Sequence, residues 1–165
     1  RFSRLAGGYT RQQAIDAGWS WGLSLDAQSN LGRNLESSER FSLGGADGVR
    51  AYAAGEAAGD SGLVGSLEVR RQFAGFQGLS MVAFLDAGHI RQNTRHVAEL
   101  AGASPNSYGL SGGGLALRME RPGYHAALSV AHPFGHNPGE DAAGRDSEGR
   151  TDRPTRWWLA VGLRF

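Results

Sequence analysis

The sequence has no cysteine and no lysine. The absence of cysteine excludes disulfides, thiol catalysis and zinc–thiolate sites. All 17 basic residues are arginine and 16 residues are acidic, so we expect no nucleic-acid partner, which would need a basic excess. Long apolar runs are missing too, and none approaches the roughly 20 residues of a membrane-spanning helix. This composition still allows a transmembrane β-barrel, whose strands alternate lipid-facing and polar residues.

Apolar and polar residues alternate with a period of two along much of the sequence. In Trp19–Gln28 every odd position is apolar and every even position is polar or glycine. A stretch of this length matches one tilted transmembrane strand. The pattern predicts seven strands, at residues 2–11, 19–28, 63–73, 79–88, 108–119, 124–130 and 157–165. At Gly112-Gly113-Gly114, where the alternation is interrupted, we expect a β-bulge.

The connections between these strands alternate in length. Residues 31–61, 91–106 and 135–154 are long and polar, whereas the turns at Gly75–Gly78 and Pro122-Gly123 are short. Short turns on one rim and long loops on the other are typical of a bacterial outer-membrane barrel. Aromatic residues near strand ends fit either the membrane interfaces or an ordinary core, namely Trp19, Trp21, Tyr108, Tyr124, Trp157 and Trp158. The predicted fold is therefore an all-β, antiparallel transmembrane barrel, with a soluble β-sandwich as the alternative.

The predicted strand count has a consequence for the extent of the barrel. Single-chain bacterial barrels have even strand numbers, and an open sheet edge is not tolerated in lipid. We therefore expect residues 1–165 to be the C-terminal part of a barrel whose other strands lie upstream. The last predicted strand is amphipathic and ends on Phe165, which looks like the signal by which the barrel-assembly machinery recognises its substrates.

Two groups of motifs identify a family. The first comprises Phe41-Ser42-Leu43-Gly44-Gly45, Val49-Arg50-Ala51-Tyr52, Gly55-Glu56, Gly59-Asp60-Ser61-Gly62 and Leu67-Glu68, and the second is Phe84-Leu85-Asp86-Ala87-Gly88. With these residues the sequence resembles the transporters of two-partner secretion, the haemolysin-activator and filamentous-haemagglutinin-transporter family. That family belongs to the outer-membrane barrel-assembly superfamily. Ala51 departs from the family pattern, which has glycine there, and alanine would be disfavoured if the position needed a positive φ.

The resemblance implies that residues 31–61 enter the barrel lumen as a plug or latch, with Arg50 at the tip pairing with Asp86 on the wall. The alternation supports this pairing independently, because Asp86 shares a face with Phe84 and Gly88, opposite the apolar row, and so points inward. A lone inward carboxylate favours a guanidinium partner. We expect Gly88 to leave room for the incoming backbone. The alternative is a solvated Arg50 and another partner for Asp86.

Together the candidate site comprises Val49, Arg50, Ala51, Tyr52, Phe84, Asp86 and Gly88, with Glu68 on the neighbouring strand as a second acceptor. Inward polar residues such as Ser24, Asp26, Gln28, Ser66, Glu68 and Arg70 would line the path of a translocated chain. We expect no enzymatic activity, cofactor or metal site. His132 and His136 have a ligand-like spacing, but Pro133 and Gly135 break the helix that it would need. For residues 140–152 a solvated loop is favoured over a calcium site.

The function implied by the resemblance is a pore in the outer membrane of a Gram-negative bacterium. It would secrete a large partner exoprotein, with or without activating it, and without ATP, after soluble periplasmic domains upstream of this sequence capture that partner. Expected partners are the exoprotein, outer-membrane lipid and the barrel-assembly machinery. The alternatives are a barrel-assembly insertase, a porin or adhesin barrel, and a soluble ligand-binding β-domain.

Overall fold

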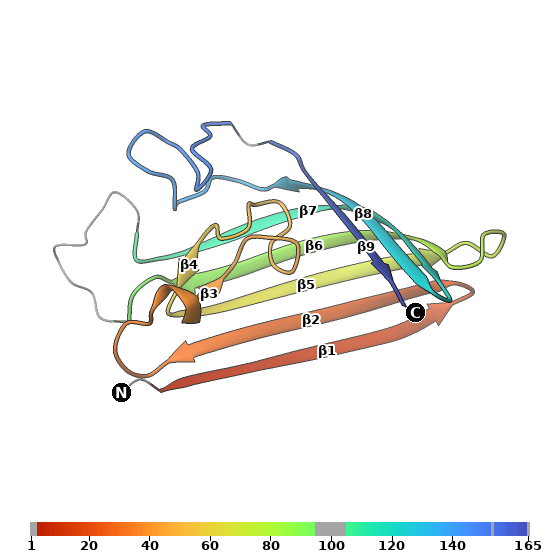
Figure 1. The fold of residues 1–165 in the computed structure, drawn as a ribbon, viewed down its shortest axis with the longest axis horizontal. Helices are drawn as coiled ribbons and strands as arrows, with labels where there is room; N and C mark the ends of the chain where they lie inside the picture. Colours follow the sequence, from red (N-terminus) through yellow and green to blue (C-terminus); the bar gives the residue numbers. More distant parts are fainter. Residues whose placement is uncertain (1–2, 95–104, 153, 165) are drawn as a thin grey trace.

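The computed structural model describes residues 3–94, 105–152 and 154–164. Seven strands form one antiparallel sheet in the order β1-β2-β5-β6-β7-β8-β9, which confirms the predicted all-β fold (Figure 1). The strands are β1 (Arg4–Asp16), β2 (Trp19–Asn30), β5 (Ser61–Gln72), β6 (Leu79–Arg91), β7 (Ser107–Arg121), β8 (Tyr124–Pro133) and β9 (Arg156–Leu163). Within the described residues, no helix has the length and apolar character needed to cross a membrane.

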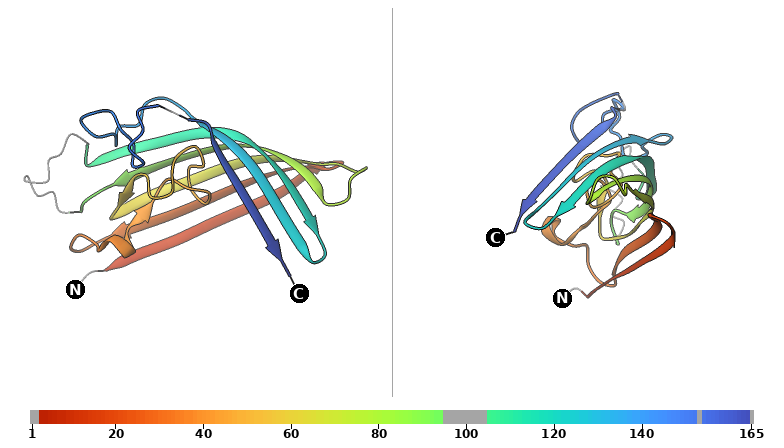
Figure 2. Two further views of the ribbon diagram at one scale, coloured as in Figure 1. Left: turned by 45° about the horizontal axis from the view of Figure 1, so that its top comes forward. Right: turned by 90° about the vertical axis from the view of Figure 1, so that its right-hand side faces the viewer.

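The sheet is curved and open. Viewed along the strands, it bends around the segment between β2 and β5, and the first and last strands lie on the two sides of the opening (Figure 2). Three long connections, residues 31–60, 92–106 and 134–155, leave from one end of the strands, and short turns join them at the other end. The predicted alternation of loop lengths is therefore present.

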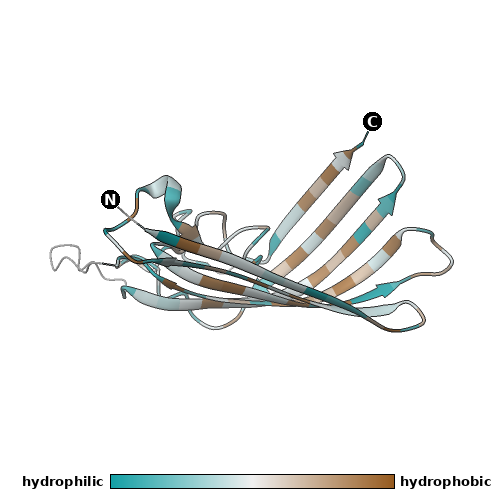
Figure 3. Ribbon diagram, turned by 90° about the horizontal axis from the view of Figure 1, so that it is seen from below, coloured by the Kyte–Doolittle hydropathy of each residue, from teal (hydrophilic) through white to brown (hydrophobic). Residues whose placement is uncertain are grey.

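The two faces of the sheet differ in chemistry because each strand alternates. The convex face carries exposed apolar side chains, and Leu159 at its β9 end is 73% exposed. Bands of apolar residues alternate with polar ones along the strands (Figure 3). The other large exposed apolar residues on this face include Leu63, Leu67, Val69, Met81, Leu85, Leu115, Leu117, Leu128, Trp157, Val161 and Leu163. The concave face carries the polar residues of the alternation. Ser24 and Ser66, which pair across β2 and β5, are two of them.

One expectation about the strands is wrong, and one alternative is resolved. The glycine triplet makes no bulge, since β7 keeps one continuous register with β6 and with β8. Its inward glycines instead make room, because a Cβ on Gly114 would lie 2.7 Å from the ring of Phe84. The irregularity lies in β1, between Ala14 and Asp16. Of the two positions open to Tyr108, the structure shows the core one, since this residue is buried.

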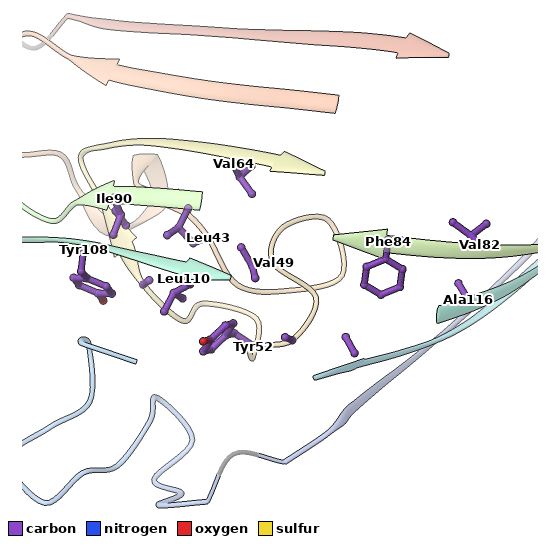
Figure 4. Packing of buried hydrophobic residues seen from close by; sticks show 13 residues of the cluster. Leu43, Val49, Tyr52, Val64, Val82, Phe84, Ile90, Tyr108, Leu110 and Ala116 are labelled. Carbon is purple, nitrogen blue, oxygen red and sulfur yellow. The ribbon is translucent and has the colours of Figure 1, made fainter. Parts of the chain in front are cut away.

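The buried apolar core lies between the concave face and the segment that crosses it (Figure 4). This segment contributes Leu43, Val49 and Tyr52, and the sheet contributes residues from four strands. The sheet residues are Val64, Val82, Phe84, Ile90, Tyr108, Leu110, Ala116 and Ala131. The core therefore fixes this segment against the wall, which is what positions the candidate site.

Candidate functional site

The segment between β2 and β5, residues 31–60, is called the inner loop below. Its two arms are joined by short strands, β3 (Phe41–Ser42) and β4 (Ala58–Gly59), and it contains one 3-10 turn, η1 (Ser37–Glu39). Beyond β3 the arms stay together through a backbone bond from the Gly44 N–H to the Glu56 carbonyl, 3.0 Å long. A side chain at Gly44 would collide with the backbone there, since a Cβ would lie 2.2 Å from the Ala53 carbonyl oxygen.

Asp60 fixes the base of the inner loop. Its carboxylate accepts hydrogen bonds from the backbone N–H of Leu35 at 3.0 Å and of Thr94 at 2.8 Å. Arg40 lies 3.7 Å away as an ion pair. Burial raises the pKa of the Asp60 carboxyl, but these hydrogen bonds and the charge of Arg40 outweigh it, so the pKa lies below its ordinary value. Asp60 thus stays ionised and joins three segments of chain.

Arg50 lies at the tip of the inner loop and is buried against Asp86 on β6. Its Nε and Nη2 donate to the two carboxylate oxygens at 2.8 and 2.7 Å, and its backbone N–H donates to Oδ2 at 3.1 Å. Arg50 is 7% exposed and Asp86 is 2% exposed. Ser66 completes the group by donating to Asp86 at 2.7 Å. This is the bidentate geometry in which a guanidinium binds a carboxylate most strongly.

A second carboxylate extends this cluster. Arg50 Nη1 donates to Glu68 Oε1 at 2.8 Å, and Arg118 on β7 donates to both oxygens of Glu68 at 2.7 and 2.8 Å. The guanidinium carbon of Arg50 also lies 3.5 Å from the ring centroid of Phe84. Two cations and two anions therefore alternate between the inner loop and the wall, which balances the charges that burial would otherwise make costly.

The backbone around Arg50 is held as well as its side chain. The indole N–H of Trp158 on β9 donates to the Arg50 carbonyl at 2.8 Å, so this aromatic residue faces inward. Ala51 has no positive φ, and a Cβ at Gly112 would lie 2.4 Å from the Ala51 Cβ. Alanine is compatible with this backbone because the wall opposite has a glycine.

The structure brings the candidate residues of the loop and the wall together, with one difference in detail. The room beside Gly88 is taken by a side chain rather than by loop backbone, since a Cβ at Gly88 would lie 2.6 Å from a Leu43 methyl group. Val49 and Tyr52 belong to the buried apolar core. Phe165 lies outside the described residues.

Sequence reasoning missed Arg118 and the inward role of Trp158. Arg118 stands between Leu117 and Met119, so the alternation already placed it on the polar face. Trp158 likewise lies between the outward Trp157 and Leu159. The alternation therefore indicated the inward direction of both side chains. Their contacts could not be predicted from it, because the partners of these residues lie far away in the sequence. Among the described residues, no group of three or more His, Asp or Glu side chains could hold a metal ion.

Comparison with known proteins identifies the family. Residues 1–118 match the family model described as haemolysin secretion/activation protein ShlB/FhaC/HecB. No curated protein matches the sequence. Because the match covers 118 of 165 residues, the chain belongs to the ShlB/FhaC/HecB family of haemolysin secretion/activation proteins, the transporters of two-partner secretion.

Proposed function

We propose that this chain is the C-terminal part of an outer-membrane barrel that exports a large partner exoprotein, and that the inner loop closes its lumen. The observation that carries the proposal is the burial of Arg50, from a long connection, in a bidentate ion pair with Asp86 on the concave wall. A connection that only joins two neighbouring strands can stay at the end of the sheet. A loop that blocks a pore has to lie across the concave face, as this one does.

The convex face supports placement in a membrane. Exposed apolar side chains cover it from β2 to β9, whereas soluble monomers rarely expose contiguous apolar patches above a few hundred Å². The long connections at one end fit the extracellular side of a bacterial barrel. The unpaired edges of β1 and β9 require closure by other strands, because lipid offers their backbone no hydrogen bonds.

The concave face supports transport of a polypeptide. Ser24, Asp26 and Arg70 lie on it and offer polar contacts along the route of an unfolded chain. For the exoprotein to pass, Arg50 leaves Asp86 and the inner loop moves out of the lumen. This mechanism involves no covalent chemistry and no ATP, and folding of the exported protein outside the cell supplies the free energy.

The decisive experiment measures secretion by the full-length transporter. Arg50→Gln removes the charge and the bidentate pair, and we expect much less exoprotein in the culture medium because the loop loses its resting position. Arg33→Gln is the matched control, since Arg33 is an exposed arginine of the same loop. The barrel itself is followed in outer-membrane fractions as a heat-modifiable gel band. Normal secretion by Arg50→Gln would overturn the proposal.

A conservative variant separates charge from geometry. Arg50→Lys keeps the positive charge but cannot span both oxygens of Asp86 and also reach Glu68, because an ammonium is a point donor. We expect secretion by Arg50→Lys to fall close to that of Arg50→Gln. Full activity of the lysine variant would mean that charge alone suffices, contrary to the proposed latch.

A further inference from the structure

The connection between β8 and β9, residues 134–155, contacts the inner loop at a second place, apart from the ion-pair cluster in its partners. The contact centres on Glu56, which is 3% exposed. One carboxylate oxygen of Glu56 accepts from the side-chain amide of Asn137 at 2.8 Å. The other accepts from the backbone N–H of Ser147 at 3.0 Å and from the Ser147 hydroxyl. A buried anion is thus held by donors from one distant segment.

The turn that carries Ser147 is built to hold this position. Residues 141–145 and 146–150 repeat the pattern Asp-x-x-Gly-Arg, and both turns have the same backbone–backbone hydrogen bonds. Asp146 Oδ1 accepts from the backbone N–H groups of Glu148 and Arg150, both at 2.9 Å, and Gly149 has a φ of 78°. The second turn therefore presents a defined backbone N–H and hydroxyl to Glu56.

The same turn is tied to the last strand. Arg156 on β9 pairs with Asp146 at 3.3 Å and with Glu148 at 3.0 Å. Two residues further along β9, Trp158 donates to the Arg50 carbonyl. The connection and the last strand thus hold the inner loop at two points, Glu56 and Arg50.

We propose that residues 134–155 form an outer clasp, which retains the inner loop through Glu56 independently of the Arg50–Asp86 pair. Release of the loop then requires both contacts to open. The clasp lies at the end with the long connections, where residues 141–143 and 147–152 are exposed. Its part in secretion rests on the proposed function, but its retention of the loop is a property of the resting protein.

The clasp can be tested by replacing Glu56 with glutamine, which has nearly the same shape but no charge. The Asn137 amide cannot turn over freely, because its Oδ1 accepts from the Gly139 N–H at 2.9 Å. Glu56→Gln therefore sets an amide NH₂ against the NH₂ group of Asn137 or takes an acceptor from Ser147. The first arrangement leaves the buried amide of Asn137 without an acceptor, and the second takes the acceptor shared by the backbone N–H and hydroxyl of Ser147; losing such partners is costly. The matched control is Glu36→Gln, an exposed glutamate of the same inner loop.

The readout is the accessibility of the inner loop. Ala53 lies in this loop, is 1% exposed, and can be replaced by cysteine in a sequence that has no other. The full-length transporter, with any cysteine outside this sequence replaced, is labelled with a maleimide in isolated outer membranes without exoprotein. We expect Glu56→Gln to speed labelling of Ala53→Cys about tenfold, equivalent to about 1.4 kcal/mol, and Glu36→Gln to leave the rate unchanged.

A second variant approaches the clasp from its other side. Ser147→Ala removes only the hydroxyl donor, so we expect a smaller but measurable acceleration, while Thr151→Ala in the same connection has no effect. The heat-modifiable band checks that each barrel is folded. Equal labelling of Glu56→Gln and Glu36→Gln, with fast labelling of Arg50→Gln, overturns the clasp and leaves the proposed function standing. Fast labelling of Glu56→Gln with normal secretion by Arg50→Gln supports the clasp and refutes the proposed function.

Discussion

Replacement of Asp86 by asparagine tests the energy that holds the inner loop in place. The variant keeps the size of the side chain and removes its charge. Three hydrogen bonds from Arg50, at 2.7 to 3.1 Å, and one from Ser66 reach this carboxylate. Removing one partner of a buried ion pair costs about 3–5 kcal/mol. Glu68 still binds Arg50, so we expect the lower end of this range.

A loss of about 3 kcal/mol corresponds to about a 10²-fold larger open population of the loop. Backbone hydrogen exchange of the full-length transporter in detergent micelles measures this population, because the N–H groups of Leu43, Gly44, Val49 and Tyr52 are hydrogen-bonded only while the loop is folded. We expect peptides covering residues 43–57 to lose about 10²-fold protection in Asp86→Asn. Strands β5 to β7 should keep theirs.

The control is Asp26→Asn, an exposed carboxylate on the same concave face. Combining Asp86→Asn with Arg50→Gln should cost less than the sum of the two, because each already removes the same interaction. A loss of protection below threefold would refute the reasoning, and so would equal losses in the loop and the strands, which would indicate unfolding of the wall rather than release of the loop.

Three further predictions follow from the wall, the loop base and the convex face. Gly112→Val should displace the inner loop, since a Cβ there lies 2.4 Å from that of Ala51; overpacking costs about 1–3 kcal/mol and appears as lost exchange protection in residues 43–57. The pKa of Asp60 is depressed below its ordinary 3.8, so the stability that its carboxylate gives the inner loop is complete above that pH and disappears as the pH falls through the folded-state pKa. Limited proteolysis of residues 31–42 should therefore accelerate in acid. Asp60→Asn should remove that pH dependence. Leu159→Arg on the convex face should impair insertion into lipid vesicles by about 2–4 kcal/mol, whereas Gln12→Arg on the concave face should insert normally; equal insertion of both would argue against lipid on the convex side.

Alternation alone predicted the strands because each strand has one apolar and one polar face. The segments starting at Trp19, Leu63, Leu79 and Tyr124 begin in the structure within two residues of their predicted starts. The glycine triplet misled the prediction, since glycine in a strand signals either a bulge or a close approach of another group. Here the approaching groups are Ala51 and Phe84, and local sequence contains no information about which of the two applies.

The pairing of Arg50 with Asp86 could be anticipated because an inward carboxylate needs a cation and the motif supplies one. The contacts of Glu56 could not be, since Asn137 and Ser147 lie 81 and 91 residues away and belong to an irregular connection. No periodicity relates such residues. Their meeting depends on the path of the whole sheet, which carries the β8–β9 connection to the same end as the inner loop.

Glu68 is shared between Arg50 and Arg118, so departure of the loop affects the two wall carboxylates differently. When Arg50 leaves, Glu68 keeps both of its bonds to Arg118, while Asp86 keeps only the hydroxyl of Ser66. Two anions and one cation remain, so the vacated wall carries one net negative charge concentrated at Asp86. A basic stretch of a passing chain and the returning Arg50 then compete for this carboxylate, which gives the empty channel an electrostatic bias toward closing again.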